Sequence, residues 1–144
     1  MYNEKNLIYI FTILGCIEKC WIYTKGFDKA IDFVFANQQK DLNVVISMFI
    51  AIGEESKKIE PKLKEDISTQ INWKHVAGIR DKISHSYRGV DEEVLWTIIH
   101  KDLYTVQDAI IEMIKLIKPS DEILDQFFKL RYYQHIQHLK QRVL

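Results

Sequence analysis

Three residues within one short segment could carry out chemistry on a phosphodiester. Arg80 is followed five positions later by His85, and Tyr87 comes two residues after the histidine. Arginine presents a planar, permanently charged fork that matches phosphate oxygens, and histidine exchanges protons close to neutral pH. This combination indicates cleavage of a phosphodiester, most simply in RNA. The neighbouring tyrosine hydroxyl is a place where a covalent modification could stop the reaction.

The reaction that these groups could perform requires no metal ion. A histidine would take the proton from a ribose 2′-hydroxyl, and the freed oxygen would attack the adjacent phosphorus. Arg80 would stabilise the negative charge that gathers on the phosphoryl oxygens, while a second proton donor assists the leaving 5′ oxygen. The products would be a 2′,3′-cyclic phosphate and a 5′-hydroxyl. DNA lacks the 2′-hydroxyl and would be inert.

The segment around the motif, about residues 72–87, is expected to form one helix. At about 100° per residue, Arg80 and His85 would then lie about 140° apart and could not converge on one phosphate. Either the helix is distorted near its end, or two copies of the chain share a cleft. We favour the second, because two histidines of a symmetric pair can divide the roles of base and acid. Ser84 shares the helix face of Arg80, and Asp81 shares that of His85, which makes both supporting polar residues.

Composition limits how RNA could be held. The chain has 144 residues, 47% of them hydrophobic and 28% charged, which fits one soluble domain with one core. Its formal net charge is zero, whereas a protein that holds nucleic acid by bulk electrostatics would be basic. Any contact with RNA must therefore be local or assembled across two subunits. With 5 Gly and 2 Pro, helices are favoured over a many-stranded sheet.

The spacing of apolar residues predicts an all-α protein, an antiparallel bundle of four to six helices. The expected helices cover about residues 3–25, 28–36, 41–59, 72–87 and 91–118. The first is apolar on every side, which indicates burial on more than one side, and we expect a second subunit to cover it. Gly26 is expected to end this helix, and Asp28 and Asp91 are expected as N-caps. Gly53, inside a helix, indicates a close helix crossing.

Two further stretches complete the expected organisation. Pro61 and the polar residues 62–70 are expected to form a surface connection. Residues 1–118 are expected to form the main helical domain, and residues 119–144 one additional amphipathic helix packed on that domain.

The motif and its surroundings resemble a known family. Arg80, His85 and Tyr87 match the R-x4-H-x-Y signature of HepT-type toxins, within the wider HEPN group of helical ribonucleases. The run I-G-E-E at residues 52–55 resembles the I-G-E segment of the family's third helix. Trp73 with G-I-R-D at residues 78–81, and V-L-W at 94–96, resemble the segments around its motif. The likeness covers about residues 3–117, and the tail beyond Pro119 departs from it.

This resemblance implies a partner and a means of control. Such proteins are helical homodimers in which the two motifs face each other across the interface. They are cytoplasmic toxins encoded beside a minimal nucleotidyltransferase antitoxin, which transfers AMP to the motif tyrosine, here Tyr87. Arg80 and His85 carry over as catalytic residues, and Asp81 as the polar residue after the arginine. The resemblance implies no cofactor. Ends or loops of transfer RNA would suit a toxin as substrate, although no residue selects them.

Two other interpretations of the chain stay open. It could be a non-catalytic helical subunit that docks a nucleotidyltransferase and presents a substrate, or merely accepts AMP on Tyr87. It could also be a purely structural helical dimer, which would leave the polar motif unexplained. Cleavage of RNA by the purified protein would distinguish the ribonuclease from both of these alternatives.

The remaining candidate residues have simpler explanations. Cys16 and Cys20 lie four apart in an apolar helix and are expected to be small buried residues of a reducing compartment. His135 and His138 could ligate a metal, but no acidic or sulfur partner adjoins them, so we expect no metal site. His75 and His100 are expected to be structural.

The apolar run of residues 7–17 raises the question of export. The run is too short to span a bilayer, and Glu4 beside Lys5 makes a poor positive region for a signal peptide. We therefore expect a buried helix and no membrane partner.

Overall fold

Helices make up most of the chain. The computed structural model describes residues 1–85 and 89–144, with the backbone but not the side chain of His85. Apart from one ladder of two-residue strands, the elements in these ranges are helical, which confirms the predicted all-α class. They divide into more segments than the four to six expected, because three of the expected helical stretches are interrupted.

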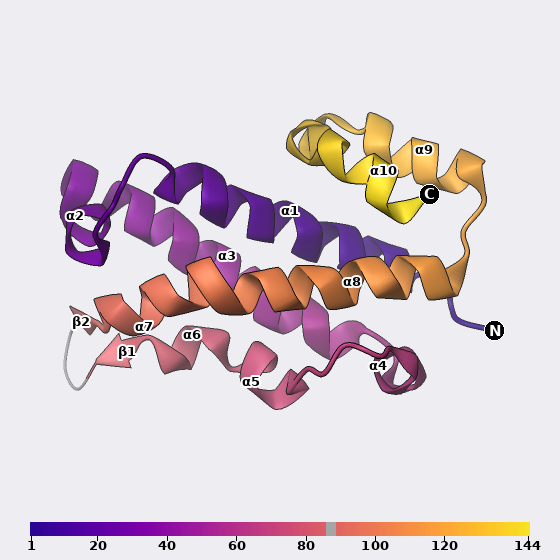
Figure 1. Ribbon diagram of the computed structural model, residues 1–144, viewed down its shortest axis with the longest axis horizontal. Helices are drawn as coiled ribbons and strands as arrows, with labels where there is room; N and C mark the ends of the chain where they lie inside the picture. The colour runs from indigo at the N-terminus through magenta and orange to yellow at the C-terminus, as the bar shows by residue number, and fades with distance from the viewer. Residues whose placement is uncertain (86–88) are drawn as a thin grey trace.

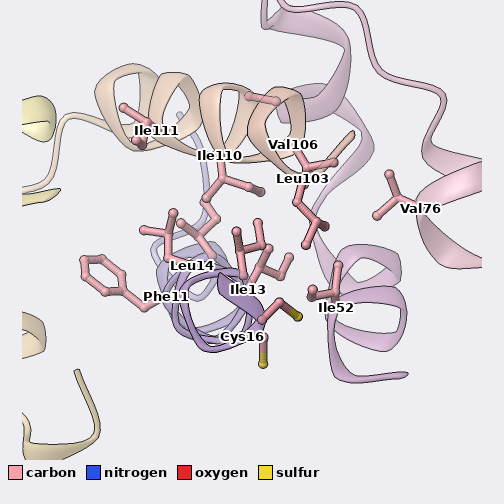
Figure 2. Packing of buried hydrophobic residues seen from close by; sticks show 14 of the residues in the cluster. Phe11, Ile13, Leu14, Cys16, Ile52, Val76, Leu103, Val106, Ile110 and Ile111 are labelled. Atoms are coloured by element: carbon pink, nitrogen blue, oxygen red, sulfur yellow. The ribbon is translucent and has the colours of Figure 1, made fainter. Parts of the chain in front are cut away.

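Three long helices form the centre of the fold: α1 (Asn6–Thr24), α3 (Lys40–Lys58) and α8 (Leu103–Ile117). Figure 1 shows α1 and α3 running antiparallel beside each other, with α8 packed against α1. Their apolar side chains converge on one core, in which Phe11, Ile52 and Ile110 are fully buried (Figure 2). Burial of this face is what holds the bundle together.

Helix α1 is enclosed on almost every side. Its side chains from Leu7 through Ile17 include six apolar residues that are no more than 1% exposed. By length and composition alone α1 could cross a membrane, but 61% of this stretch is buried inside the protein. Gly26 follows the helix at a φ of 93°, a conformation that favours glycine, so the expected stop is confirmed.

Both cysteines lie inside the core, as expected. Cys16 and Cys20 are free and buried. Burial raises the pKa of the Cys16 thiol to about 11 and raises that of Cys20 as well. Neither thiol is therefore reactive at neutral pH.

The connection between α1 and α3 contains an unusual turn. Helix α2 (Ala30–Phe35) is followed by the short helix η1 (Ala36–Gln39). The residue before α2 is Lys29, with no side-chain cap, so the Asp28 cap is wrong. Within η1, three consecutive non-glycine residues, Asn37 to Gln39, have left-handed backbone angles. They reverse the chain so that α3 can return along α1.

Residues 61–66 form a helix rather than the expected surface connection. Helix α4 (Pro61–Asp66) has proline in its first turn, where the missing N–H costs nothing. Its Leu63 is fully buried and Ile67 nearly so. The apolar residues at 63 and 67, four apart, anchor a turn that the polar composition concealed.

The segment that carries the motif is not one helix. It consists of α5 (Trp73–Ala77), α6 (Ile79–Lys82) and the strand β1 (Ser84–His85), which pairs with β2 (Gly89–Val90). The prediction of a continuous helix over 72–87 is therefore wrong. The chain leaves helical geometry at Gly78 and after Lys82, where extended pairing with the following segment replaces the next helical turn.

The next helix begins where expected but contains a bulge. Asp91 caps α7 (Glu92–Thr97) by accepting a hydrogen bond from the Val94 N–H at 3.1 Å. The chain continues into α8 through η2 (Ile98–Asp102), one turn of π-helix. Trp21 Nε1 donates to the Ile99 carbonyl oxygen at 2.8 Å; a carbonyl turned toward a side chain in this way accompanies an interrupted helical ladder.

The tail forms three pieces rather than the single expected helix. They are α9 (Asp121–Lys129), η3 (Arg131–Leu139) and α10 (Lys140–Val143). Leu130 adopts an extended conformation and turns the chain back over α1 (Figure 1). Phe127 stacks on Phe11 with ring centroids 4.5 Å apart, and Phe128 packs on the same ring edge-on. The tail, rather than a second subunit, covers this side of α1.

Polar side chains fasten the tail to the bundle. His138 Nε2 lies 2.7 Å from Glu18 Oε1, and Gln107 Nε2 donates to the other oxygen of Glu18 at 2.7 Å. Arg142 donates to Gln107 and forms an ion pair with Asp108. His135 Nε2 lies 2.9 Å from the carbonyl oxygen of Gly15. Both tail histidines thus have protein partners, in keeping with a structural role.

Candidate active site

The predicted arginine lies on an open groove between two parts of the fold. One wall comes from α2, η1 and α3, and the other from α6, β1, β2 and the first residue of α7. We call it the motif groove, with a volume of about 660 Å³. Its lining residues are Val34, Phe35, Gln39, Leu42, Asn43, Ile46, Arg80, Ser84, Gly89, Val90 and Glu92. A hollow of this size is suitable for a small ligand or one unit of a polymer.

Arg80 is half-buried and held by a neighbouring hydroxyl. Its Nη1 donates to Ser84 Oγ at 2.7 Å, which fixes the orientation of the guanidinium. In the ranges that the structure describes, no carboxylate forms an ion pair with it. Among the described residues Ser84 is the one hydrogen-bond partner of the guanidinium, and toward this part of the chain most of its five N–H donors are available to an anion such as a phosphate.

The local fold explains how Arg80 reaches the groove. Ile79 and Ile83, on either side of it, are buried and anchor the segment to the core. At the end of α6 the Asp91 N–H donates to the Ile83 carbonyl at 2.7 Å. This bond and the pairing of Ser84 with Val90 end the helix. Ser84, four residues after Arg80, accepts the arginine hydrogen bond across the end of the helix.

A close helix crossing sets the position of this segment. A Cβ placed on Gly53 of α3 would lie 2.7 Å from the carbonyl oxygen of Ala77 in α5. Only glycine permits this approach, so the predicted close crossing is confirmed. Because Ala77 is followed by Gly78 and then α6, the crossing holds the start of the segment that carries Arg80.

The structure shows one of the two geometries considered for the motif, the distorted helix end; the cleft shared by two copies stays a prediction. The helix ends before His85, whose backbone pairs with Gly89 in the two-stranded ladder. The distorted helix end is therefore what occurs, and the angle on an ideal helix no longer separates Arg80 from His85. The separation of about 140° on an ideal helix is therefore no longer an argument for a second subunit. The need for one histidine as base and another as acid still favours a dimer.

The other predicted site residues are placed as follows. Ser84 contacts Arg80 and lines the motif groove. Asp81 is exposed and does not line it. For His85 only the backbone is described, and Tyr87 lies outside the described residues. The catalytic and supporting roles assigned to these residues stay predictions.

Several lining residues of the groove were not foreseen from the sequence. Phe35 is 61% exposed although it is aromatic, and Gln39, Asn43 and Glu92 place polar groups on the same groove. Phe35, Gln39 and Asn43 precede Arg80 by more than 35 residues, whereas Glu92 follows the motif closely. The one signal in the sequence was Phe35. Because Phe33 and Val34 already supply the buried side of α2, a third large apolar residue beside them is left facing solvent.

A second, smaller hollow lies on the other side of α6. It has a volume of about 230 Å³ and is lined in part by His75, Ile79, Lys82 and Asp102. Of the predicted site residues whose side chains the structure describes, Arg80, Asp81 and Ser84, none lines it. It therefore adds no candidate for the reaction.

Comparison with known proteins gives relatives described as ribonucleases. A "Probable ribonuclease HepT" of Thermococcus cleftensis is 38% identical over 69 residues, which are 48% of this chain and 62% of that protein. A "Gamma-glutamylcyclotransferase and putative RNase" of Methanocaldococcus jannaschii is 32% identical over 108 residues, 75% of this chain and 47% of that one. The chain thus spans less than two thirds of the length of both.

One further relative matches over nearly its whole length. It is a "Putative RNase" of Methanocaldococcus jannaschii, 31% identical over 114 residues, which are 79% of this chain and 92% of that protein. No solved structure gives a significant match.

A family model described as "Ribonuclease HepT-like" matches residues 13–114. This range is more than half of the chain and contains α1 from Ile13 onward, all of α3, the motif groove and the whole segment from Arg80 to Tyr87. The tail that covers α1 lies beyond it. With the motif, the helical fold and the relatives in agreement, the chain belongs to the ribonuclease HepT-like family of HEPN-type proteins.

Proposed function

We propose that this protein is a metal-independent endoribonuclease that cleaves RNA by attack of a ribose 2′-hydroxyl on the adjacent phosphorus. The observation that carries the proposal is the position of Arg80. Its guanidinium lies on an open groove, is oriented by Ser84 at 2.7 Å and belongs to the R-x4-H-x-Y motif of a HepT-like chain. A fixed cation beside a groove is suitable for holding a scissile phosphate.

Arg80 has two tasks in this reaction. It binds the phosphate in the ground state, and it stabilises the extra negative charge on the phosphoryl oxygens as the 2′ oxygen attacks. Because Ser84 already holds the guanidinium, little reorganisation is needed when charge develops. Half-burial strengthens the interaction relative to that of a fully solvated arginine.

His85 transfers the protons. As a neutral imidazole it takes the proton from the 2′-hydroxyl, and as an imidazolium it gives one to the leaving 5′ oxygen. One ring cannot do both in a single step. We therefore propose a symmetric homodimer in which the histidines of the two protomers share these roles, with Asp81 as a nearby polar support.

The R-x4-H-x-Y signature supports a proposal about the biological setting. We propose that the protein is the toxin of a toxin–antitoxin pair in the cytoplasm, without a membrane partner. A cognate minimal nucleotidyltransferase would silence it by adding AMP to Tyr87. Each adenylyl group adds a phosphodiester charge and a bulky nucleoside next to the motif, and both would oppose the entry of RNA.

The test is cleavage of RNA by the purified protein in EDTA. We expect products with 2′,3′-cyclic phosphate and 5′-hydroxyl ends. Arg80→Ala should lower kcat by about 10²–10³-fold, as loss of a transition-state hydrogen-bond donor does, and His85→Ala by about 10²–10⁴-fold. Matched controls are Arg131→Ala and His75→Ala, both exposed and outside the motif groove, which should cleave as the unchanged protein does.

Two results would count against the proposal. Cleavage that needs an added divalent metal would exclude the mechanism. Absence of cleavage, together with modification of Tyr87 by the partner enzyme, would favour the non-catalytic docking subunit. Circular dichroism and sedimentation of each variant show whether a loss of activity comes from loss of the fold or of the dimer.

A further inference from the structure

The motif groove contains groups that the cleavage reaction does not use. On the wall formed by α2, η1 and α3, Phe35 is 61% exposed, and Gln39 and Asn43 are exposed residues with carboxamide side chains. Next to the motif, Glu92 adds a half-buried carboxylate. A cation for phosphate, an open aromatic face and hydrogen-bonding groups on one hollow are the features by which proteins hold a single-stranded nucleotide.

The backbone that positions this wall is strained. Asn37, Gln38 and Gln39 have φ values of 49°, 56° and 68°, in the left-handed region that residues other than glycine rarely adopt. Asn37 Nδ2 donates to Asp41 Oδ2 at 2.7 Å and supports the turn. Strained residues concentrate at functional sites. Here the strained turn places Gln39 on the same groove as Phe35.

From this arrangement we infer that the motif groove is a subsite for one nucleotide of the RNA, next to the scissile linkage. Arg80 binds the phosphate, Phe35 stacks on the base, and Gln39, Asn43 and Glu92 contact its edge. The inference rests on the proposed function, to which it adds selectivity for the base. The groove, at about 660 Å³, is large enough for a nucleotide.

The polar groups indicate which bases fit. An ionised carboxylate can only accept hydrogen bonds, whereas a carboxamide both donates and accepts. The exocyclic amino groups of adenine, cytosine and guanine donate to such acceptors, and a carboxamide pairs with two atoms of adenine. Uracil has no amino group, and its one donor on that edge, N3–H, lies between two carbonyl oxygens that a carboxylate repels, whereas the amino groups of the other bases lie at the end of the edge. The subsite therefore selects bases that carry an amino group over uracil.

A second copy of the chain is the rival occupant of the groove. It could cover the exposed Phe35, but it would also have to satisfy the amides of Gln39 and Asn43, the Glu92 carboxylate and the N–H donors of Arg80 that Ser84 does not use. Burying such groups without partners is costly. A nucleotide supplies a phosphate, a ring and donors together, which is why we favour it.

The experiment uses the full chain and chimeric oligonucleotides. Each is DNA with a single ribonucleotide, so that only one linkage can be cleaved, and the base on each side of that linkage is varied in turn. The readout is kcat/KM for each base. We expect at one position at least a tenfold preference for adenine, cytosine or guanine over uracil.

Two substitutions distinguish the contribution of the groove side chains to nucleotide binding from their contribution to the stability of the fold. Phe35→Ala should raise KM about tenfold or more, as loss of one base–aromatic stack does. Gln39→Gly removes an amide but suits the left-handed backbone, so it should reduce the base preference without lowering Tm. Gln38→Gly is its matched control, because Gln38 shares the strained turn but does not line the groove. Tyr132→Ala, exposed and in the tail, is the control for Phe35→Ala.

A binding measurement distinguishes failure of the inference from failure of the proposed function. The same oligonucleotides with 2′-deoxyribose throughout cannot be cleaved, and their affinity is measured by fluorescence anisotropy. Base-dependent affinity that Phe35→Ala abolishes supports the subsite even if no RNA is cleaved. Unchanged affinity and base preference in both Phe35→Ala and Gln39→Gly overturn it. Dissociation of a dimer by Phe35→Ala, with base preference intact, assigns the groove to a second copy instead.

Discussion

Gly53→Ala tests whether a helix crossing far from the reaction positions Arg80. The added Cβ would lie 2.7 Å from the Ala77 carbonyl oxygen and 3.3 Å from that of Val76. Close C···O contacts in proteins are about 3.3–3.6 Å, so α3 and α5 must separate by roughly 0.6 Å. Both contacts are to backbone atoms, which cannot rotate away as a flexible side chain could.

The expected loss of stability combines two opposing effects. Alanine is favoured over glycine in a helix interior by about 1 kcal/mol, whereas overpacking costs about 1–3 kcal/mol and sometimes more. Because the added Cβ meets backbone oxygens that cannot rotate away, we expect overpacking to cost the upper end of that range, about 3 kcal/mol. Less the gain of about 1 kcal/mol from alanine, the net loss is about 2 kcal/mol. For a chain of this length the loss corresponds to a decrease in Tm of about 8 °C.

The effect on activity should exceed the effect on stability. Ala77 is followed directly by Gly78 and the helix that carries Arg80, so a shift of α5 moves the guanidinium. A misplacement of about 1 Å can cost about 100-fold in rate, and we expect at least a tenfold decrease in kcat at temperatures where Gly53→Ala is folded. Urea unfolding and RNA cleavage measure the two effects separately.

Gly78→Ala is the matched control for stability. Its Cβ would lie 3.5 Å from the Lys74 carbonyl oxygen, an ordinary contact, and Gly78 has a negative φ. We expect its free energy of unfolding to change by no more than about 0.5 kcal/mol. If Gly53→Ala unfolded at the same urea concentration as the unchanged protein and cleaved RNA equally well, the close crossing would not position the motif.

Three further predictions concern other parts of the fold. Burial alone would raise the pKa of Glu112, but hydrogen bonds from residues 68–69 lower it to about 2 from the ordinary 4.5. The stability that they give is therefore fully present above pH 4.5 and lost as the pH falls toward 2. Glu112→Gln should lower the free energy of unfolding by about 1–2 kcal/mol at neutral pH, and urea unfolding curves of the two proteins should approach each other in acid. Phe128→Ala should cost about 3–5 kcal/mol by leaving a cavity under the tail, whereas Tyr132→Ala, 81% exposed, should change stability by less than about 0.5 kcal/mol in the same assay. Tyr87→Phe should cleave RNA but escape silencing by the nucleotidyltransferase, and mass spectrometry that found AMP on another residue of this variant would contradict the assignment.

The tail covers part of the region that the family model matches. The region matched by the family model ends at residue 114, and the chain beyond it packs Phe127 and Phe128 on Phe11. An ion pair and hydrogen bonds to α1 and α8 hold it there. One side of α1 is consequently closed within the protomer, so a dimer of this chain must form through another surface.

The sequence by itself determined the helices whose signals are local. The apolar periodicity of α1 and α3, the stop at Gly26 and the cap at Asp91 depend on residues within one or two turns of each other. The motif and the family could be identified for the same reason, since residue types at fixed spacing are enough. The all-α class followed from these patterns.

Only the tertiary structure decided the shape of the candidate site. A continuous helix over the motif fits the spacing of the apolar residues, yet the chain leaves it at Gly78 and again where β1 pairs with β2. Phe35 and Gln39 reach the groove of Arg80 through a strained left-handed turn, to which Asn, Gln and Gln give no clear local signal. These features depend on contacts between residues far apart in the chain, whose free energy outweighs local backbone preference and cannot be read from spacing alone.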